Sequence, residues 1–141
     1  MPTRTAEAEW KGSLREGEGR VALGSGAFSG AYSFRSRFEE GTGTNPEELL
    51  GAAHAGCFSM ALAAGLGAAG HAPESIRTIA SVSIEPEDGG FAITRSALET
   101  EARVPGIEES EFQRLADEAK AGCPVSKALA GVQIELEARL L

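Results

Sequence analysis

The sequence predicts an α+β protein in which a mainly antiparallel sheet packs against a long, buried central helix. A stretch without formal charge at residues 49–70 predicts the helix, and alternating polar and apolar residues on both sides of it predict strands. The predicted order is strands, long helix, hairpin, two helices and strand, without βαβ repetition, which is typical of the α+β class. A length of 141 residues suits a single domain, so we expect one domain over residues 1–141.

Three strands are expected before the central helix. Polar and apolar residues alternate over residues 4–11, and residues 20–23 and 31–38 continue as the second and third strands. The glycine-rich segment 24–30 is followed by a strand rather than a helix, so it does not have the context of a phosphate-binding loop. We interpret it as a hairpin connection.

The central helix has a clear start signal. Asn45 is a good N-cap, Pro46 suits the first helical position, and Glu48 stands three residues after the cap. Residues 49–70 are apolar on every face, although they are rich in Ala and Gly and lack flanking Lys or Arg, which argues against a membrane span. A helix that is apolar all round must be buried all round. Because so short a chain cannot easily cover it, we expect a second copy to do so in an isologous dimer.

After the central helix, the pattern predicts a hairpin, two helices and a closing strand. Residues 76–84 and 91–104 pair around a tight turn, and a phase change in the apolar positions predicts a bulge or a twist near residues 94–97. Residues 108–121 predict an amphipathic helix, followed by a short helix after Cys123 and an alternating strand at residues 132–140 with one wet face. The predicted apolar stripe of the first of these helices is Phe112, Leu115, Ala116 and Ala119.

Composition excludes several classes of function. The formal net charge is −8, which argues against a partner with a phosphate backbone and against an anionic membrane surface. The first ten residues contain no apolar core of a signal peptide, so we expect a cytoplasmic protein. In a reducing cytosol, Cys57 and Cys123 are expected to be inert packing residues or redox thiols rather than a permanent structural disulfide.

The two cysteines have different local settings. Burial in an apolar helix raises the pKa of a thiol such as Cys57, so its reactivity would require a nearby cation. Cys123 stands at a helix N-cap before Pro124, where free N–H groups stabilise a thiolate. A separation of 66 residues excludes a CxxC motif. With the two cysteines, His54 and His71 could formally complete a zinc site, and His54 lies one turn from Cys57 on the helix. No Cys-x-x-Cys or His-x-x-x-His pair supports them, so we expect no metal.

Three segments together resemble a known family: Arg37-Phe-Glu, GTNPEELLGAAHAGCFSMAL from Gly43, and AGCPVSKAL from Ala121. They resemble the osmotically inducible protein C (OsmC) family, in the branch close to the organic hydroperoxide resistance proteins. The expected order of elements matches over nearly the whole chain. The resemblance implies an OsmC-like fold in an intertwined homodimer, and a cysteine-based peroxidase that prefers organic hydroperoxides. It implies no metal, flavin or haem cofactor, and an external dithiol or thiol protein as reductant.

The resemblance also assigns roles to four residues. Cys57 would be the peroxidatic thiol and Cys123 the resolving thiol that captures its sulfenic acid. Arg37 would supply the activating cation, and Glu47 the carboxylate that holds it. These roles are physically reasonable, because a thiolate attacks a peroxide and a guanidinium stays charged beside it.

Two rivals and one difficulty remain at this stage. Arg35 lies two residues from Arg37 and shares its face on the expected strand, and Glu48 adjoins Glu47. Ten helical residues separate Glu47 from Cys57 by roughly 15 Å along the axis. The arginine must span this gap, or the second subunit must contribute part of the site.

Two other classes of function remain open. The protein could be a non-catalytic module whose apolar dimer groove holds a hydrophobic ligand, or a structural stress protein without turnover. Phe58 and Met60 would give a peroxidase an apolar mouth, although core packing explains such side chains equally well. Consumption of thiols by an organic hydroperoxide distinguishes the enzyme from both alternatives.

Overall fold

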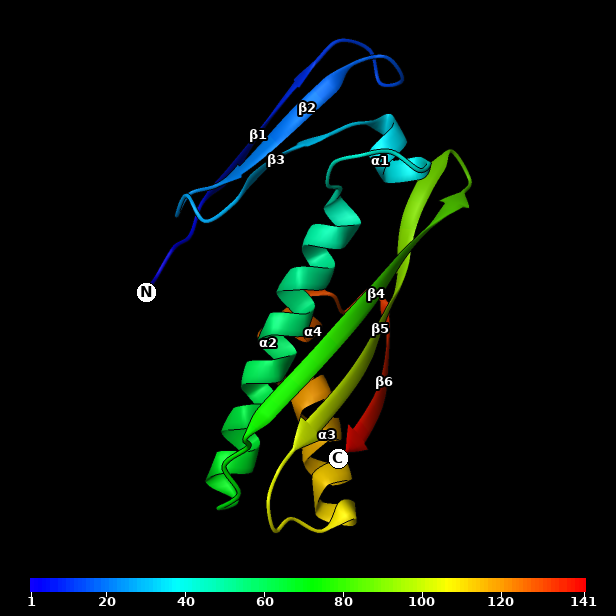
Figure 1. Cartoon of the computed structure of the whole chain (residues 1–141). Helices are drawn as coiled ribbons and strands as arrows, with labels where there is room; N and C mark the ends of the chain where they lie inside the picture. The colour runs from blue at the N-terminus through cyan, green and yellow to red at the C-terminus, as the bar shows by residue number, and fades with distance from the viewer. The chain divides into compact units, whose positions relative to one another are not determined.

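The computed structural model describes all residues from Met1 to Leu141. They form two compact units, Met1–Leu49 and Leu50–Leu141 (Figure 1). The long helix α2 (Pro46–Ala68) begins in the first unit and continues in the second. The organisation of residues 1–141 as a single domain stays a prediction.

The first unit contains a three-stranded antiparallel sheet in the order β1-β2-β3. The Trp10 and Tyr32 rings pack at its end, with their centroids 5.3 Å apart. The glycine-rich segment joins two neighbouring antiparallel strands, which confirms the predicted hairpin connection. The strands are β1 (Ala6–Lys11), β2 (Glu18–Leu23) and β3 (Ser29–Tyr32).

The prediction of a continuous strand over residues 31–38 is wrong. After Tyr32 the chain forms the short helix α1 (Phe34–Phe38). A capping box starts this helix: the Ser36 N–H donates to Ser33 Oγ at 3.1 Å, and the Ser33 N–H donates to Ser36 Oγ at 2.8 Å. Residues two positions apart on a helix are about 200° apart around its axis, so Arg35 and Arg37 do not share a face.

The second unit contains a mixed sheet in the order β4-β5-β6. Strands β4 (Ser75–Glu87) and β5 (Gly90–Arg103) are antiparallel, whereas β6 (Gln133–Leu140) pairs with β5 in parallel. The predicted bulge is confirmed, because Ser83 pairs with Arg95 and Ile84 with Ile93, which leaves Thr94 as the extra residue.

Helices α3 (Glu109–Gly122) and α4 (Pro124–Ala128) connect β5 to β6. A connection of this length allows the chain to return and pair in parallel. The predicted apolar stripe of α3 is confirmed, since all four of its residues are buried in the core. Side chains from α2, from β5 and from the residue after β5 complete the core, which consists of Phe58, Leu62, Leu66, Leu98, Ala102, Val104, Phe112, Leu115, Ala116 and Ala119.

Helix α2 starts as predicted but is not buried on all sides in one chain. Asn45 Oδ1 accepts the Glu48 N–H at 2.8 Å, and the Glu48 carboxylate accepts the Thr44 hydroxyl at 2.8 Å.

By length and composition alone α2 could cross a membrane, but the core helix of a soluble protein can have the same length and composition. One face of α2 packs in the core, while Met60 on the other face is 77% exposed. This exposed face consists of Ala52, Ala53, Gly56, Met60, Ala64 and Gly67.

Candidate active site

A bidentate ion pair joins α1 to the first turn of α2. Arg37 Nε donates to Glu47 Oε1 at 3.1 Å, and Arg37 Nη2 donates to Glu47 Oε2 at 2.9 Å. The Glu47 side chain is only 7% exposed, and a carboxylate so buried requires a charged partner. Two parallel hydrogen bonds hold the guanidinium plane in one orientation.

Hydrogen bonds that Ser36 donates and accepts hold α1 in position for the pair of Arg37 and Glu47. The Ser36 hydroxyl donates to the Thr44 carbonyl at 2.7 Å, and the Asn45 side-chain amide donates to the Ser36 carbonyl at 3.0 Å. The residues that cap α1 and α2 therefore also tie the two helix starts together. The same motif that begins α2 thus positions both Arg37 and Glu47.

The rival residues of the sequence analysis have other partners. Arg35 lies 3.7 Å from Glu39 in an ion pair in which both side chains are more than half exposed. An ion pair of this kind contributes little to stability. Glu48 accepts the hydroxyl of Thr44. Neither rival takes part in the buried pair of Arg37 and Glu47.

The two cysteines meet within the second unit. Cys57 lies on α2 and Cys123 is the N-cap residue of α4, yet their Sγ atoms are 2.9 Å apart. Both are free thiols; Cys123 is buried and Cys57 is half-buried. The four predicted residues therefore form two pairs, with Arg37 and Glu47 in the first unit and the cysteines in the second.

Local environment raises the pKa of Cys57. The largest cause is burial, which penalises the thiolate, and the contact with Cys123 adds to it. The Val125 N–H acts in the opposite direction but is outweighed. Within the second unit alone, the Cys57 thiol is therefore harder to ionise than an ordinary cysteine.

Local environment lowers the pKa of Cys123. Burial alone would raise it, but interactions of the sulfur with the Cys57 thiol, with the Ser126 N–H and hydroxyl and with the Val125 N–H outweigh burial. The Cys123 side chain makes no capping hydrogen bond to α4. Cys123 is therefore the more acidic thiol of the pair.

His54 is fully buried one turn before Cys57 on α2. Its Nδ1 lies 2.7 Å from Ser96 Oγ on β5, and its Nε2 lies 2.8 Å from Ser126 Oγ on α4. Burial lowers the pKa of His54, so its imidazole is neutral at neutral pH. The histidine thus connects three elements through hydrogen bonds on both ring nitrogens.

Sequence reasoning missed Ser96 and Ser126 as members of this site. Ser96 does carry a signal, because it occupies a core-facing position of β5, two residues before the buried Leu98. A polar residue at such a position requires a hydrogen-bond partner. No local pattern identifies Ser126, because its partner lies on a distant helix.

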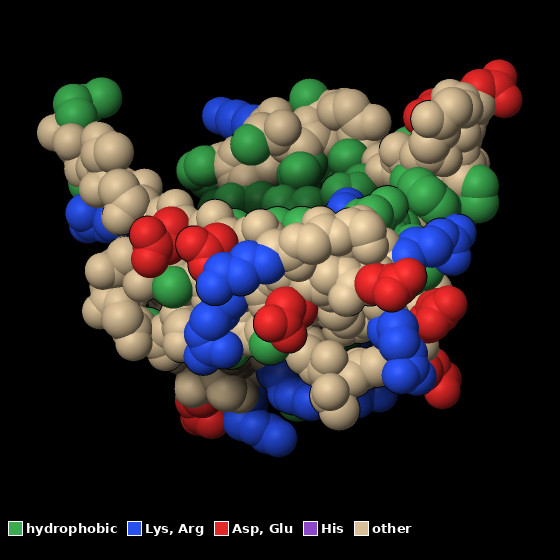
Figure 2. Space-filling view, turned by 90° about the horizontal axis from the view of Figure 1, so that it is seen from above, with side chains coloured by type: hydrophobic (Ala, Val, Ile, Leu, Met, Phe, Trp, Pro, Cys, Tyr) green, Lys and Arg blue, Asp and Glu red, His purple; other side chains and the backbone are tan.

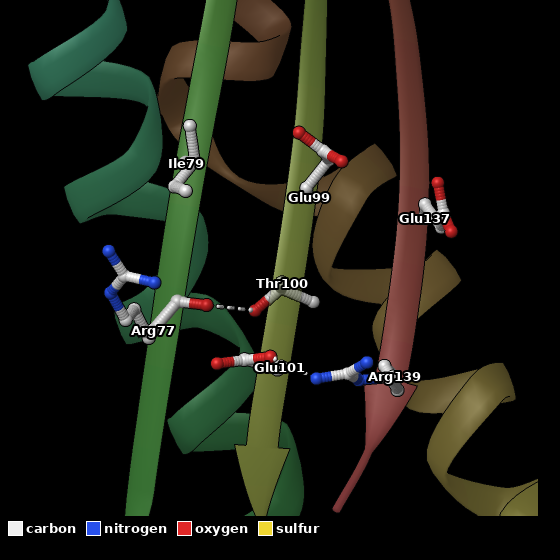
Figure 3. Close-up of a pocket in the computed structure, with 7 residues that line it drawn as sticks. All are labelled: Arg77, Ile79, Glu99, Thr100, Glu101, Glu137 and Arg139. Atoms are coloured by element: carbon white, nitrogen blue, oxygen red, sulfur yellow. Dashed lines mark hydrogen bonds and ion pairs between the residues drawn. The ribbon is translucent and has the colours of Figure 1, made fainter.

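No group of three or more His, Cys, Asp or Glu side chains is arranged to hold a metal ion. A shallow hollow of about 210 Å³ lies on the sheet face away from the helices, where Arg139 pairs with Glu101 at 2.7 Å (Figure 3). Acidic and basic side chains are intermingled on the face seen in Figure 2. Of the two residues expected at an apolar mouth, Phe58 is fully buried and Met60 is exposed.

Comparison with known proteins gives consistent matches. A family model described as OsmC-like protein matches residues 39–137. The chain is 52% identical over 127 residues to peroxiredoxin OsmC of Escherichia coli strain K12, with 89% of each chain covered. It is 39% identical over 93 residues to an organic hydroperoxide resistance protein of Xanthomonas axonopodis pv. citri, with 64% of this chain and 63% of that protein covered. The crystal structure of an organic hydroperoxide resistance protein OsmC from Legionella pneumophila superposes with a TM-score of 0.72 at 25% identity, and 96% of each chain is covered.

Proposed function

The chain belongs to the OsmC-like protein family, and from this premise we propose that it is a cysteine-based peroxidase that reduces organic hydroperoxides to alcohols. Relatives that are named peroxiredoxin or organic hydroperoxide resistance protein support this activity. The observation that carries the mechanism is the 2.9 Å separation of the Cys57 and Cys123 sulfur atoms, which belong to residues 66 positions apart. Two thiols this close can form a disulfide after one of them is oxidised.

In the first step, the Cys57 thiolate attacks the terminal oxygen of the hydroperoxide. The sulfur is oxidised to a sulfenic acid and the O–O bond breaks, while the alkoxide leaves and takes up a proton to become the alcohol. Because burial raises the pKa of Cys57, this step needs a cation near the sulfur.

Arg37 is the proposed source of that cation. Glu47 holds its Nε and Nη2 atoms, and the Nη1 end, which neither bond uses, remains available for the peroxide and the departing oxygen. A fixed guanidinium stabilises charge that develops in the transition state without reorganising during the reaction.

In the second step, Cys123 attacks the sulfenic acid on Cys57. The S–S bond forms, the S–O bond breaks, and hydroxide leaves and takes up a proton to become water. An external dithiol or thiol protein then reduces the disulfide by thiol exchange and is itself oxidised. A reducing cytoplasm supplies such thiols, and the proposed chemistry requires no metal or prosthetic group.

Thiol titration tests this function directly. We expect one equivalent of an organic hydroperoxide to remove two free thiols per chain, because each turnover oxidises Cys57 and Cys123 together. The measurement counts thiols with a chromogenic disulfide before and after addition of cumene hydroperoxide. Unchanged thiols would exclude the peroxidase and favour a protein that only binds hydrophobic ligands.

We further propose that the protein is a homodimer. The exposed face of α2 defined above is an uninterrupted stripe of small and apolar residues, with Met60 as its one large side chain. Small side chains allow a second helix to approach closely, and a soluble chain buries such a stripe if it can. A second copy of α2 supplies the cover, as expected from the all-apolar helix in so short a chain.

Met60→Glu is expected to weaken the dimer on the order of a hundredfold, because an unpaired charge at an apolar contact costs about 3 kcal/mol or more. Sedimentation at micromolar concentration measures the change. Ile79→Glu is the matched control, because Ile79 is 47% exposed and lies on the sheet face away from the helices (Figure 3). A wild-type monomer, or a Met60→Glu protein as dimeric as the control, would contradict this proposal.

A further inference from the structure

A buried row of hydrogen-bonding groups leads from Ser96 on β5 through His54 to Ser126 on α4. Ser96 Oγ lies 2.7 Å from His54 Nδ1, and His54 Nε2 lies 2.8 Å from Ser126 Oγ. Ser126 stands three residues after Cys123 on the short helix that Cys123 caps. All four residues are buried, and no buried side-chain nitrogen or oxygen atom lacks a partner.

A neutral imidazole donates from one nitrogen and accepts at the other, so two arrangements of the hydrogens are possible. If Nε2 carries the hydrogen, it donates to Ser126 Oγ, and the Ser126 hydroxyl hydrogen is free to point at Cys123. If Nδ1 carries it, Nε2 accepts the Ser126 hydrogen and the sulfur loses this donor. A hydrogen bond to a thiolate is charge-assisted and therefore stronger than one to a neutral imidazole, so ionisation of Cys123 favours the first arrangement.

We propose that His54, with its hydrogen on Nε2, is a positioning residue that turns the Ser126 hydroxyl toward Cys123 and so offers a hydrogen-bond donor to the resolving thiol. This inference rests on the proposed function, because the acidity of Cys123 matters to the reaction only if Cys123 attacks the Cys57 sulfenic acid. Ser96 fixes the arrangement by donating its hydroxyl hydrogen to Nδ1. The histidine itself does not touch the peroxide or either reacting sulfur.

No other buried titratable group competes with this row in the second unit. Helix α2 carries no charge between Leu49 and Ala68, and Arg95 beside Ser96 on β5 is exposed and pairs with Glu135 at 3.7 Å. Lys127 next to Ser126 on α4 is exposed. The groups that face Cys123 are therefore the Cys57 thiol and the polar hydrogens of Val125 and Ser126.

The position of the hydrogen can be measured in the wild-type protein. The chain contains only two histidines, His54 and His71, so nitrogen NMR of histidine-labelled protein gives two imidazole patterns. His54→Gln removes one pattern and assigns the other. We expect Nε2 of His54 to be protonated and Nδ1 unprotonated at neutral pH, and the reverse would overturn the proposal.

The effect on Cys123 can be measured without peroxide. In a Cys57→Ser background, the rate of Cys123 alkylation by iodoacetamide is followed against pH. Ser126→Ala and His54→Leu are expected to move the midpoint up by about one pH unit, because a hydrogen bond to a charged group is lost. His54→Gln is expected to leave the midpoint close to that of the Cys57→Ser background, since the glutamine amide can still donate to Ser126.

Ser59→Ala is the matched control for Ser126→Ala. It removes a hydroxyl of the same unit that pairs with Thr78 Oγ1 at 2.8 Å and does not belong to the row. If Ser126→Ala moves the midpoint no further than this control, the inference fails even though the peroxidase survives. If wild type consumes no thiols with hydroperoxide but the midpoint shifts as expected, the proposed function fails and the hydrogen-bonding role of His54 stands.

Discussion

Replacement of Cys57 by Ser is expected to abolish hydroperoxide reduction. A serine hydroxyl stays protonated at neutral pH, is a far weaker nucleophile than a thiolate, and cannot form a sulfenic acid. Consumption of cumene hydroperoxide with excess dithiol measures the loss, which we expect to reach the uncatalysed background. Turnover by Cys57→Ser equal to that of wild type would rule out its role as the peroxidatic thiol.

Cys123→Ser is the companion variant, because it separates the two chemical steps. It is expected to permit one oxidation of Cys57, to form no intramolecular disulfide, and to leave Cys57 open to oxidation beyond the sulfenic acid. Intact-mass analysis after stepwise additions of hydroperoxide distinguishes sulfenic acid, disulfide and the higher acids. A normal disulfide in this variant would show that Cys123 is not the resolving thiol.

Arg37→Ala is expected to slow the oxidation of Cys57 about a hundredfold, since loss of a fixed charged donor of this kind costs about 3 kcal/mol. Two losses contribute to this hundredfold decrease in rate. The thiolate loses its cation, and the departing oxygen loses its hydrogen-bond donor. The measurement is the second-order rate of Cys57 oxidation by an organic hydroperoxide as a function of pH.

The pH dependence has a definite sign. Because burial and Cys123 raise the pKa of Cys57, a protein without the arginine carries little thiolate at neutral pH. The rate of Arg37→Ala should therefore keep rising with pH beyond the point at which the wild-type rate has levelled. Arg37→Lys should rescue little, because a point charge cannot make both hydrogen bonds to Glu47.

Arg35→Ala is the control for the arginine assignment. Its side chain pairs with Glu39 in an exposed ion pair, so its removal should change the rate only several-fold. If Arg35→Ala slows Cys57 oxidation strongly and Arg37→Ala does not, Arg35 is the activating arginine and the proposed peroxidase activity still holds. Unchanged rates in both variants would contradict the proposed activation of Cys57.

Elements with a long, consistent local pattern could be predicted from the sequence. The stripe of α3 repeats at helical spacing over more than two turns, and the change of phase in β5 indicated the bulge that the structure shows at Thr94. Helix α1 was missed because Phe34 to Phe38 is too short to separate a period of two from one of 3.6, and the capping box of Ser33 and Ser36 decided for the helix.

The sequence by itself determined the α+β class, the start of α2 and the residue types of the candidate site. Tertiary structure alone decided the parallel pairing of β6 with β5, the contact between Cys57 and Cys123, and the connection of His54 to Ser96 and Ser126. Local propensity acts over a few neighbouring residues, whereas these contacts join segments far apart in the chain. They form because folding buries their elements against one core, where each buried polar group requires a partner.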